Sequence, residues 1–374
     1  IILHHASVRE VVNDVLFASI LNFSLIVSLH VLYRQRRWIK SNIRDLLDVF
    51  THQDVAIDQS PDTLKVLIFN WYCVKHTWAG GAEYYVHNIA KSLVKKGHSV
   101  TLFCGNDGSC LSTEVIDGVN IIRHGGLFTV GIWAYIYYMT KFKYNFDVII
   151  DSAKGVPFFT PIYAIQPVVS LICHVHQDMF KKGLIYPLAQ IAMYLEKTAM
   201  PFVYASTPLV TISPSSRKAI HQLGFDAKKK IEIVYPGVDN VRKMGKKTKN
   251  PSLLYLGRLR DYKNVDILIK CIPSLLAKYP KLTVTIAGEG ESMKSLKRLT
   301  HKLGVQDVVT FTGRVTDEQK NVLFTQAWIV VHPSIVEGWG ISNIEANLCG
   351  TPVVAANVDG LRDSVIHSKT GLLV

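Results

Sequence analysis

The sequence is short of acidic residues. Of its 374 residues, 42 are Lys or Arg and 29 are Asp or Glu, which gives a formal net charge of +13 at pH 7. No nucleic-acid-binding motif accompanies this charge, and the Lys and Arg runs are not interleaved with aromatic residues, so we expect no nucleic-acid partner. An anionic membrane surface and an anionic small substrate account for the positive charge more economically.

The sequence also lacks two common signatures. Its six cysteines have no C-x-x-C spacing and include positions in apolar strands, such as Cys104 and Cys173, which favours reduced thiols in a cytosolic compartment. No Gly-x-Gly-x-x-Gly follows the first apolar strand, at residues 64–70, so a hydride-transferring dinucleotide enzyme is a poor interpretation.

What the sequence does contain, from residue 64 onward, is an alternation of short apolar strands and periodic helices. This alternation predicts two doubly wound α/β domains, and the chain is long enough for two hydrophobic cores. A basic stretch without periodicity, punctuated by Gly and Pro, marks the junction. We therefore expect an N-terminal domain over residues 61–239, a linker over residues 240–251 and a C-terminal domain over residues 252–374.

The first 60 residues form a separate segment with one apolar run. As a helix, residues 15–33 would be about 28 Å long, close to the hydrocarbon thickness of a bilayer. Five cations follow the run directly: Arg34, Arg36, Arg37, Lys40 and Arg44. Cations on this side predict an N-terminal membrane helix with the α/β domains on the cytoplasmic side. Because Asn22 and His30 interrupt the run, a helix that lies on the membrane or packs on the protein is one alternative. A signal peptide is a weaker one, because the positive charge follows the apolar run instead of preceding it.

A strand-loop-helix unit near the C-terminus is the most informative stretch. The apolar residues 328–332 predict a short strand, and Gly338 and Gly340 leave backbone amides open just before a helix that begins at Ile341. Free N–H groups and the positive end of the helix dipole would then face one point, where a phosphate is stabilised. The stretch therefore predicts an anion site.

Two glutamates stand on either side of this expected phosphate position. Glu337 lies in the loop and Glu345, eight residues later, lies one turn inside the helix. Their carboxylates can accept hydrogen bonds from hydroxyls that flank a diphosphate, which is the chemistry of a nucleotide-sugar. For an isolated pair, the alternative is an ordinary strand-loop-helix unit with two solvated glutamates.

A second strand ends in two residues that suit a diphosphate. Gly257 and Arg258 close the apolar residues 253–256, and Lys263 follows before the next periodic helix. Arginine as a fork and lysine as a point charge can clamp a diphosphate at such a turn. Further on, Gly288 begins a Gly-x-Gly turn after a strand, where backbone can approach a base or ribose closely.

The N-terminal domain has its own candidates. Gly80 and Gly81 open a helix that runs to residue 96, a position where a glycine pair usually serves tight packing alone. The apolar residues 168–176 predict a strand that carries His174 and His176 to its carboxyl end, where open α/β sheets bind ligands. With Asp178 these histidines could suggest a metal site, but no third ligand cluster supports one.

In their order and spacing, these segments resemble the GT-B glycosyltransferases, specifically the large retaining family 4, or glycosyltransferase group 1. Glu337 and Glu345 match its E-x7-E signature, and Arg258 with Lys263 matches its Gly-Arg-x4-Lys segment. The resemblance implies a GT-B fold, in which two doubly wound Rossmann-like domains face each other across a cleft. One departure is an Asp-Gly pair that ends in Gly360, where the family usually has Gly-Gly, and it puts the shape of that loop in doubt.

The resemblance also implies roles for individual residues. His176, Arg258, Lys263 and Glu337 would act at the sugar and the leaving diphosphate, with His174 structural. The donor would be bound by Gly80, Gly81, Gly257, Gly288, Gly338, Gly340, Ile341 and Glu345. No cofactor and no metal is implied, because enzymes of this fold generally need none. A last strand and helices that cross back to the first domain would follow Val374 in the family pattern.

The expected activity is transfer of a sugar from a UDP-, GDP- or ADP-sugar to an acceptor hydroxyl with retention of anomeric configuration. We expect a lipid-linked or polysaccharide acceptor, in glycolipid, lipid-linked oligosaccharide or surface polysaccharide synthesis. Residues 135–144, rich in Tyr and Lys, could seat the first domain on an anionic membrane, although a core helix with outward lysines explains them equally well. The alternative functions are a nucleotide-sugar epimerase or a non-catalytic scaffold of the same fold.

Overall fold

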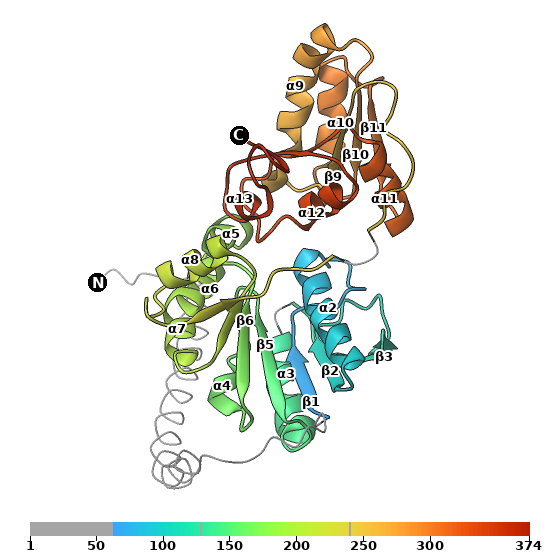
Figure 1. Cartoon of the computed structure of the whole chain (residues 1–374). Coiled ribbons are helices and arrows are strands. Elements are labelled where there is room, and N and C mark those ends of the chain that lie inside the picture. The colour runs from blue at the N-terminus through green and yellow to red at the C-terminus, as the bar shows by residue number, and fades with distance from the viewer. Residues whose placement is uncertain (1–62, 128, 239–240) are drawn as a thin grey trace, which may run out of the picture. The chain divides into compact units, whose positions relative to one another are not determined.

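The computed structural model describes residues 63–127, 129–238 and 241–374. The apolar run at residues 15–33, and with it the expected membrane helix, lies outside these residues. Within them, no helix is both long enough and apolar enough to cross a bilayer. The described chain contains two separate β-sheets, one in each half of the sequence (Figure 1).

The first sheet has eight strands in the order β3-β4-β2-β1-β5-β6-β7-β8, parallel throughout except for β3, which pairs antiparallel with β4. The strands are β1 (Lys65–Phe69), β2 (Ser99–Cys104), β3 (Thr113–Ile116), β4 (Val119–Arg123), β5 (Val148–Ala153), β6 (Val168–Ile172), β7 (Leu209–Thr211) and β8 (Ile231–Ile233). The helical segments are α2 (Gly81–Lys95), α3 (Val130–Tyr137), η1 (Tyr138–Phe142), α4 (Thr160–Tyr163), α5 (Gln177–Gly183), α6 (Leu188–Tyr194), η2 (Leu195–Ala199), α7 (Met200–Val203) and α8 (Pro214–Gln222).

The second sheet is wholly parallel, with six strands in the order β11-β10-β9-β12-β13-β14. Its strands are β9 (Ser252–Leu256), β10 (Thr283–Ala287), β11 (Val309–Gly313), β12 (Ile329–His332), β13 (Val353–Ala355) and β14 (Gly371–Leu373). The helices are η3 (Asp261–Lys263), α9 (Val265–Lys278), α10 (Met293–Lys302), α11 (Asp317–Gln326), α12 (Ile341–Leu348) and α13 (Leu361–Ser364).

Strand β1 shows why the central strands are continuous apolar runs rather than alternating ones. Val66 and Ile68 pack with α2 on one face of the sheet, whereas Leu67 and Phe69 pack with α3 and η1 on the other. Helices cover both faces of a parallel sheet, so residues on both faces of an inner strand are buried, here from Val66 to Phe69. Each of these side chains stabilises the fold by roughly 1.5–3 kcal/mol relative to an exposed one.

The same arrangement holds in the second half. Tyr255 of β9 packs with α9 and α10, while the neighbouring Leu254 packs on the opposite face with Phe324 of α11 and Ala346 of α12. Helices therefore cover both faces of each sheet (Figure 1). The carboxyl ends of the strands are left to the loops, where ligands bind in folds of this class.

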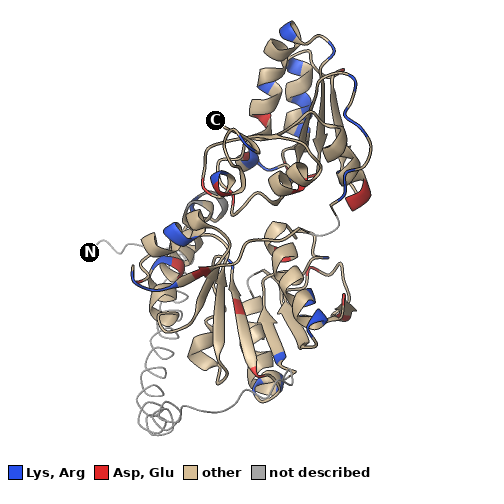
Figure 2. Cartoon of the chain, viewed as in Figure 1, with Lys and Arg blue, Asp and Glu red and all other residues tan. Residues whose placement is uncertain are grey.

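Residues 241–251 contain no helix or strand, as expected for a linker, but they are not detached from the second half. The Met244 amide donates to Thr325 Oγ1 at 2.8 Å and Lys247 Nζ donates to Ala327 O at 2.6 Å. The basic residues of this segment therefore lie along α11 (Figure 2). The domain boundaries themselves stay a prediction.

One predicted strand is too long. The run at residues 168–176 forms β6 only as far as Ile172, and His174 and His176 lie in the loop that follows. His176 is the N-cap of α5, so its backbone has left the extended conformation that would continue the strand. The two rings still lie together, with their centroids 4.0 Å apart.

Candidate functional site

The loop between β12 and α12 requires glycine for two reasons. Gly340 has φ +81°, and a Cβ there would come within 2.8 Å of Leu361 and 2.9 Å of Asn343. A Cβ on Gly338 would meet Ile212 at 3.0 Å and His174 at 3.6 Å, both in the N-terminal half. Helix α12 then begins at Ile341 as predicted, and the first N–H groups of a helix have no partner within it.

Glu337 is the centre of a hydrogen-bond network in this loop. Its Oε1 forms an ion pair with Lys263 and accepts from Ser334 Oγ at 2.9 Å. His332 Nε2 lies 3.0 Å from the same oxygen, and Asn343 holds the other ring nitrogen at 2.9 Å. Burial alone would raise the pKa of Glu337, but the charge of Lys263 and the hydrogen bond from His332 outweigh it and hold the pKa well below the usual range. The carboxylate is therefore ionised at neutral pH.

Glu345, on the first turns of α12, has a different cation. Lys320 Nζ of α11 lies 2.6 Å from Glu345 Oε1 and 3.0 Å from Asp317 Oδ1. Burial lowers the pKa of Lys320, but these two carboxylates more than compensate and raise it. The two glutamates of the signature are thus each paired with a lysine, from different elements.

Arg258 extends from the end of β9 toward the N-terminal half. Its guanidinium makes long contacts, at 3.4 Å each, with the backbone oxygen of Trp78 and the hydroxyl of Tyr262. A Cβ on Gly80 would lie 3.1 Å from the guanidinium carbon, so a glycine there leaves Arg258 its space. Arg258 and Lys263 are both at the turn where they were predicted, but only Lys263 has an anionic partner among the described residues.

The glycines that follow β9 and β10, Gly257 and Gly288, pack directly against each other. Gly288 has φ +138°, and a Cβ there would lie only 1.9 Å from Gly257 O. The two loops therefore touch backbone to backbone, which requires glycine whether or not a ligand is present. This gives Gly288 a packing role, and its contact with a nucleotide stays a prediction.

The pair Gly80–Gly81 begins α2. The Gly80 amide donates to Glu83 Oε2 at 2.8 Å, so this N–H group already has a hydrogen-bond partner. Gly81 is the first residue of α2 and therefore lies closer to the N–H groups that have no partner within the helix. A Cβ on Gly81 would lie 3.3 Å from Ile341, the first residue of α12. The N-termini of α2 and α12 thus approach each other at this point.

His174 and His176 lie at the carboxyl end of β6. Burial, together with the charge of Lys154, lowers the pKa of His176 to about 3, and burial also lowers that of His174. Both rings are neutral at pH 7. The His176 amide donates to Glu196 Oε1 at 2.7 Å, which fixes the loop. His174, expected to be structural, is the histidine closer to the signature loop, because its Nδ1 lies 3.6 Å from the position of a Gly338 Cβ.

The pair Asp359–Gly360, where the family pattern has two glycines, keeps the glycine that the loop needs. Gly360 has φ +81°, and a Cβ there would lie 2.2 Å from the backbone oxygen of Glu337. Asp359, by contrast, lies 3.5 Å from Arg362 in an exposed ion pair. The departure therefore leaves the backbone around Glu337 undisturbed.

Sequence reasoning missed several residues of the site. Lys320 and Lys154 pair with Glu345 and Glu83 from other elements, and His332 and Ser334 hold Glu337. His332 and Ser334 stand within five residues of Glu337, so a polar residue at the end of an apolar strand was the available signal. Within the described residues, no group of three or more His, Cys, Asp or Glu is arranged to hold a metal ion.

Two family models match consecutive parts of the chain. "Glycosyltransferase Family 4" matches residues 79–242, and "Glycosyl transferases group 1" matches residues 239–374. The chain belongs to the family 4, group 1 glycosyltransferases. As a member of this family it contains the two Rossmann-like sheets of a GT-B-like fold, each with helices on both faces.

Curated relatives of this glycosyltransferase family member include two proteins from Mycobacterium tuberculosis. A "GDP-mannose-dependent alpha-(1-6)-phosphatidylinositol monomannoside mannosyltransferase" is 31% identical over 45% of this chain and 49% of its own length. Glycogen synthase is 26% identical over 83% of this chain and 82% of its own length. An uncharacterized glycosyltransferase from Methanocaldococcus jannaschii is 30% identical over 46% of this chain. The matches to the mannosyltransferase and to this last protein span about half of each relative.

Solved structures show the same fold. Sucrose-phosphate synthase from Thermosynechococcus elongatus superposes with a TM-score of 0.66 at 20% identity, covering 83% of this chain and 86% of that one. HepE from Anabaena, crystallised with UDP-glucose, gives a TM-score of 0.62 at 20% identity and covers 83% and 85% of the two chains. At such identities the likeness concerns the fold alone.

Proposed function

We propose that this protein transfers a sugar from a UDP-, GDP- or ADP-sugar to an acceptor hydroxyl, with retention of anomeric configuration. The observation that carries the proposal is the ion pair of Glu337 with Lys263 beside the N-terminus of α12. It is an ionised acid and a cation held at a helix start, where a diphosphate and its sugar hydroxyls can be bound together. Family membership supports the same chemistry.

The chemical step in this proposal is departure of the nucleoside diphosphate. The bond between the anomeric carbon and the phosphate oxygen breaks, and the negative charge that develops is stabilised by Arg258, Lys263 and the amides around Gly338 and Gly340. Such preorganised electrostatic stabilisation usually contributes most of the rate enhancement. The acceptor hydroxyl attacks from the same face, and its proton passes to the leaving phosphate, so no cofactor or metal is required.

In this proposal Glu337 and Glu345 contact different parts of the donor. Glu337 keeps Lys263 in position and offers its second oxygen to a sugar hydroxyl, because the contacts described above all involve Oε1. Glu345, oriented by Lys320, accepts from the ribose. His176 and its neighbour His174 bound the sugar on the N-terminal side as neutral rings. Gly80, Gly81, Gly257, Gly288 and Ile341 complete the proposed donor site.

For the acceptor we propose a lipid-linked saccharide or a growing polysaccharide, reached on the cytoplasmic side of a membrane. The surface of α3 and η1 supports this: Ile132, Tyr135, Ile136 and Met139 recur at helical spacing and are all exposed. Tyr144, 80% exposed, follows with Lys141 and Lys143. An apolar face flanked by lysines suits an anionic membrane surface. In contrast, Tyr138 and Phe142 of the same segment belong to the core.

The test is a titration with UDP-, GDP- and ADP-sugars that compares wild type with Glu345→Gln. We expect one nucleotide to be selected and its binding to be lost in Glu345→Gln, because Glu345 accepts from the ribose in the proposed site. Glu318→Gln, on the exposed face of α11, is the matched control and should bind like wild type. Binding without turnover on any acceptor would indicate the non-catalytic scaffold, and conversion of the donor without an acceptor would indicate an epimerase.

A further inference from the structure

Trp78 lies in the loop between β1 and α2 and is 47% exposed. Trp71, in the same loop, is half-buried by contrast, and its indole N–H donates to Val156 O at 3.0 Å. Trp78 therefore leaves a large aromatic surface open to a ligand. A tryptophan that is held rigidly provides a large contact area at a low cost in conformational entropy.

The backbone of Trp78 is held on both sides. Its amide donates to His76 Nδ1 at 3.0 Å, and its carbonyl oxygen accepts from Arg258 at 3.4 Å. The Ala79 amide donates to His76 O at 2.9 Å, which closes a tight turn around Thr77 and Trp78. Burial lowers the pKa of His76, so its ring is neutral and Nδ1 can accept this hydrogen bond.

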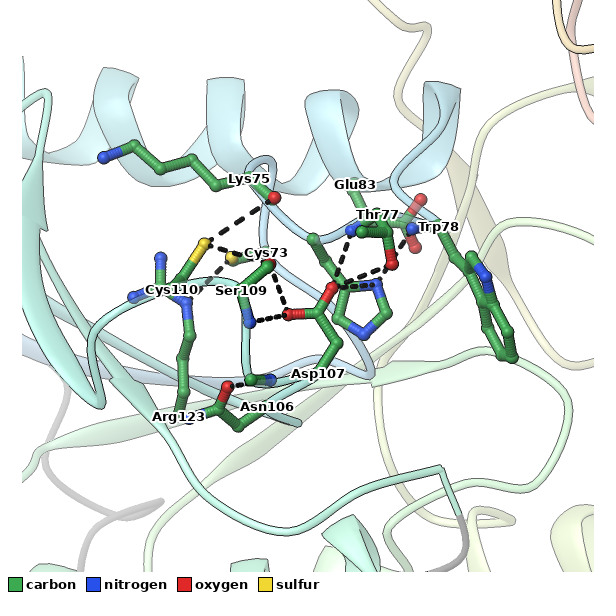
Figure 3. Close-up of polar contacts among 12 residues, drawn as sticks. Cys73, Lys75, Thr77, Trp78, Glu83, Asn106, Asp107, Ser109, Cys110 and Arg123 are labelled. Carbon is green, nitrogen blue, oxygen red and sulfur yellow. Dashed lines mark hydrogen bonds and ion pairs between the residues drawn. The ribbon is translucent and has the colours of Figure 1, made fainter. Parts of the chain in front are cut away.

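Asp107 connects this loop to the neighbouring loop between β2 and β3. Its Oδ2 accepts from the amide and the hydroxyl of Thr77, at 2.8 Å each. Its Oδ1 accepts from the Ser109 amide at 3.0 Å and from the Ser109 hydroxyl at 2.5 Å. Against the effect of burial, these hydrogen bonds hold the pKa of Asp107 well below its usual range, so the carboxylate is ionised at neutral pH. Figure 3 shows the ring of Trp78 extending away from these contacts.

Two aromatic rings of the same loop orient the indole. The centroid of the Tyr72 ring lies 6.2 Å from that of Trp78 at an interplanar angle of 88°, and the His76 ring lies 6.1 Å from it at 60°. The Tyr72 and His76 rings are themselves 4.1 Å apart. Edge-to-face contacts of this kind fix the orientation of a ring. The indole therefore needs little rearrangement to receive a flat ligand, which lowers the entropic cost of binding.

We propose that Trp78 is a stacking surface for a sugar ring of the acceptor. The C–H groups on one face of a pyranose form a flat apolar surface that suits an indole, while the hydroxyls at its rim remain hydrated. This inference rests on the proposed function, in which Arg258 faces the leaving diphosphate and Glu345 the ribose. Trp78 contacts Arg258 from the N-terminal half, which places it on the acceptor side of the reacting bond.

The assignment narrows the acceptor to a saccharide. A lipid alcohol or an open-chain polyol offers no rigid ring face to the indole, whereas the terminal sugar of a lipid-linked saccharide or a polysaccharide does. Stacking contributes equally before and during the transfer, so it acts on the affinity for the acceptor. Loss of the indole should therefore raise the Michaelis constant for the acceptor and leave the turnover number nearly unchanged.

The first experiment is saturation-transfer NMR on the full chain with the methyl glycosides of mannose, glucose, galactose and N-acetylglucosamine. We expect at least one glycoside to receive saturation mainly at the C–H protons of one ring face, and glycerol to receive none. The signal should be lost in Trp78→Ala and reduced in Trp78→Phe, which keeps a smaller ring. Leu111→Ala, at a 72% exposed position of the loop between β2 and β3, is the control and should match wild type.

The second experiment measures steady-state transfer from the selected donor to the glycoside that binds. In Trp78→Ala the Michaelis constant for the acceptor should rise about tenfold, a loss of the size expected for one aromatic contact. Leu111→Ala should leave it unchanged. A rise in the Michaelis constant for the donor instead would place Trp78 beside the donor sugar and overturn the assignment.

The NMR experiment requires neither donor nor turnover, so the two proposals can fail separately. Saturation of no glycoside, or an equal signal in wild type and Trp78→Ala, would overturn the stacking role even in a chain that transfers sugar. A signal that depends on Trp78 in a chain that turns over no donor would keep the saccharide site and reject the transferase.

Discussion

Glu337 in the C-terminal half is mostly buried and His176 in the N-terminal half is buried, yet their surroundings make the first ionised and the second neutral. Lys263 and His332 keep Glu337 ionised, whereas burial beside Lys154 keeps His176 neutral. In one case a partner outweighs desolvation, and in the other a like charge reinforces it. The two halves of the site therefore offer a ligand an ionised carboxylate on one side and a neutral imidazole on the other.

The difference matches the chemistry proposed for each side. A departing diphosphate requires fixed charge, while the sugar and its acceptor require orientation and exclusion of water. Changes on the C-terminal side should therefore have large effects on turnover, and changes on the N-terminal side should act more on acid stability.

The largest effect is expected from Lys263→Ala. The substitution removes a cation next to the leaving group and leaves the Glu337 carboxylate without its main partner, so turnover should fall on the order of 10²-fold or more. Steady-state rates with the selected donor measure this. Lys270→Ala, at an exposed lysine of α9, is the control. A rate near that of wild type would remove Lys263 from the site.

A similar loss, on the order of 10²-fold, is expected for Arg258→Ala, because this residue supplies the forked half of the clamp. Arg298→Ala, on the exposed face of α10, should have no such effect. If Arg258→Ala alters the Michaelis constant but not the turnover number, the residue binds the donor without stabilising the departing charge.

The pH at which the free energy of unfolding begins to fall should differ between His176 in the N-terminal half and Glu337 in the C-terminal half. The pKa of His176 falls from 6.5 to about 3 on folding, so the unfolded chain takes up a proton that the folded chain does not. Stability is therefore lost as pH falls through 6.5, by about 1.4 kcal/mol per pH unit for one such group. The lowered pKa of Glu337 acts later: its contribution is complete above the ordinary value of 4.5 and is lost below it.

Urea unfolding in steps from about pH 7 to about pH 4 tests this order. His176→Asn should make the decline above pH 4.5 shallower without abolishing it, because burial also lowers the pKa of His174. Glu337→Gln should change the slope only below pH 4.5. His301→Asn, at an exposed position, should follow wild type. Equal slopes for wild type and His176→Asn would show that this ring is not held neutral by the fold.

The smallest effect is expected from Lys320→Ala. Glu345 would keep its place on α12 but lose the cation that orients it, so nucleotide affinity should fall about tenfold, equivalent to about 1.4 kcal/mol. Calorimetric titration measures this, with Lys294→Ala on α10 as the control. An unchanged affinity would mean that Glu345 is positioned by its helix alone.

Much of the fold follows from local pattern. The helix predicted to begin at Ile341 does begin there, directly after Gly340, and the periodic helix predicted after Lys263 is formed by Val265–Lys278. The position of Glu337 beside open amides follows from the same stretch. These features depend on residues within a few positions of one another, which is the range that sequence pattern describes.

The pairings across the sheet could not be predicted in this way. Lys154 reaches Glu83, 71 residues away, only because β5 lies beside β1 in the sheet. Lys320 reaches Glu345 because α11 and α12 share one face of the second sheet. Strand order decides such contacts. The prediction of a strand through His174 and His176 was wrong for a local reason, since nothing in the apolar run indicates that β6 ends at Ile172.

The close approach of Gly360 to the backbone of Glu337 also limits which substitutions the pair Asp359–Gly360 can accept. Its neighbour Asp359 is exposed, and the ion pair that the described residues give it is with Arg362, at 3.5 Å. At Gly360, any of the other amino acids would have to displace the loop that carries the signature glutamate. Of these two positions, therefore, the first tolerates a side chain and the second requires glycine if the loop of Glu337 is to keep its shape.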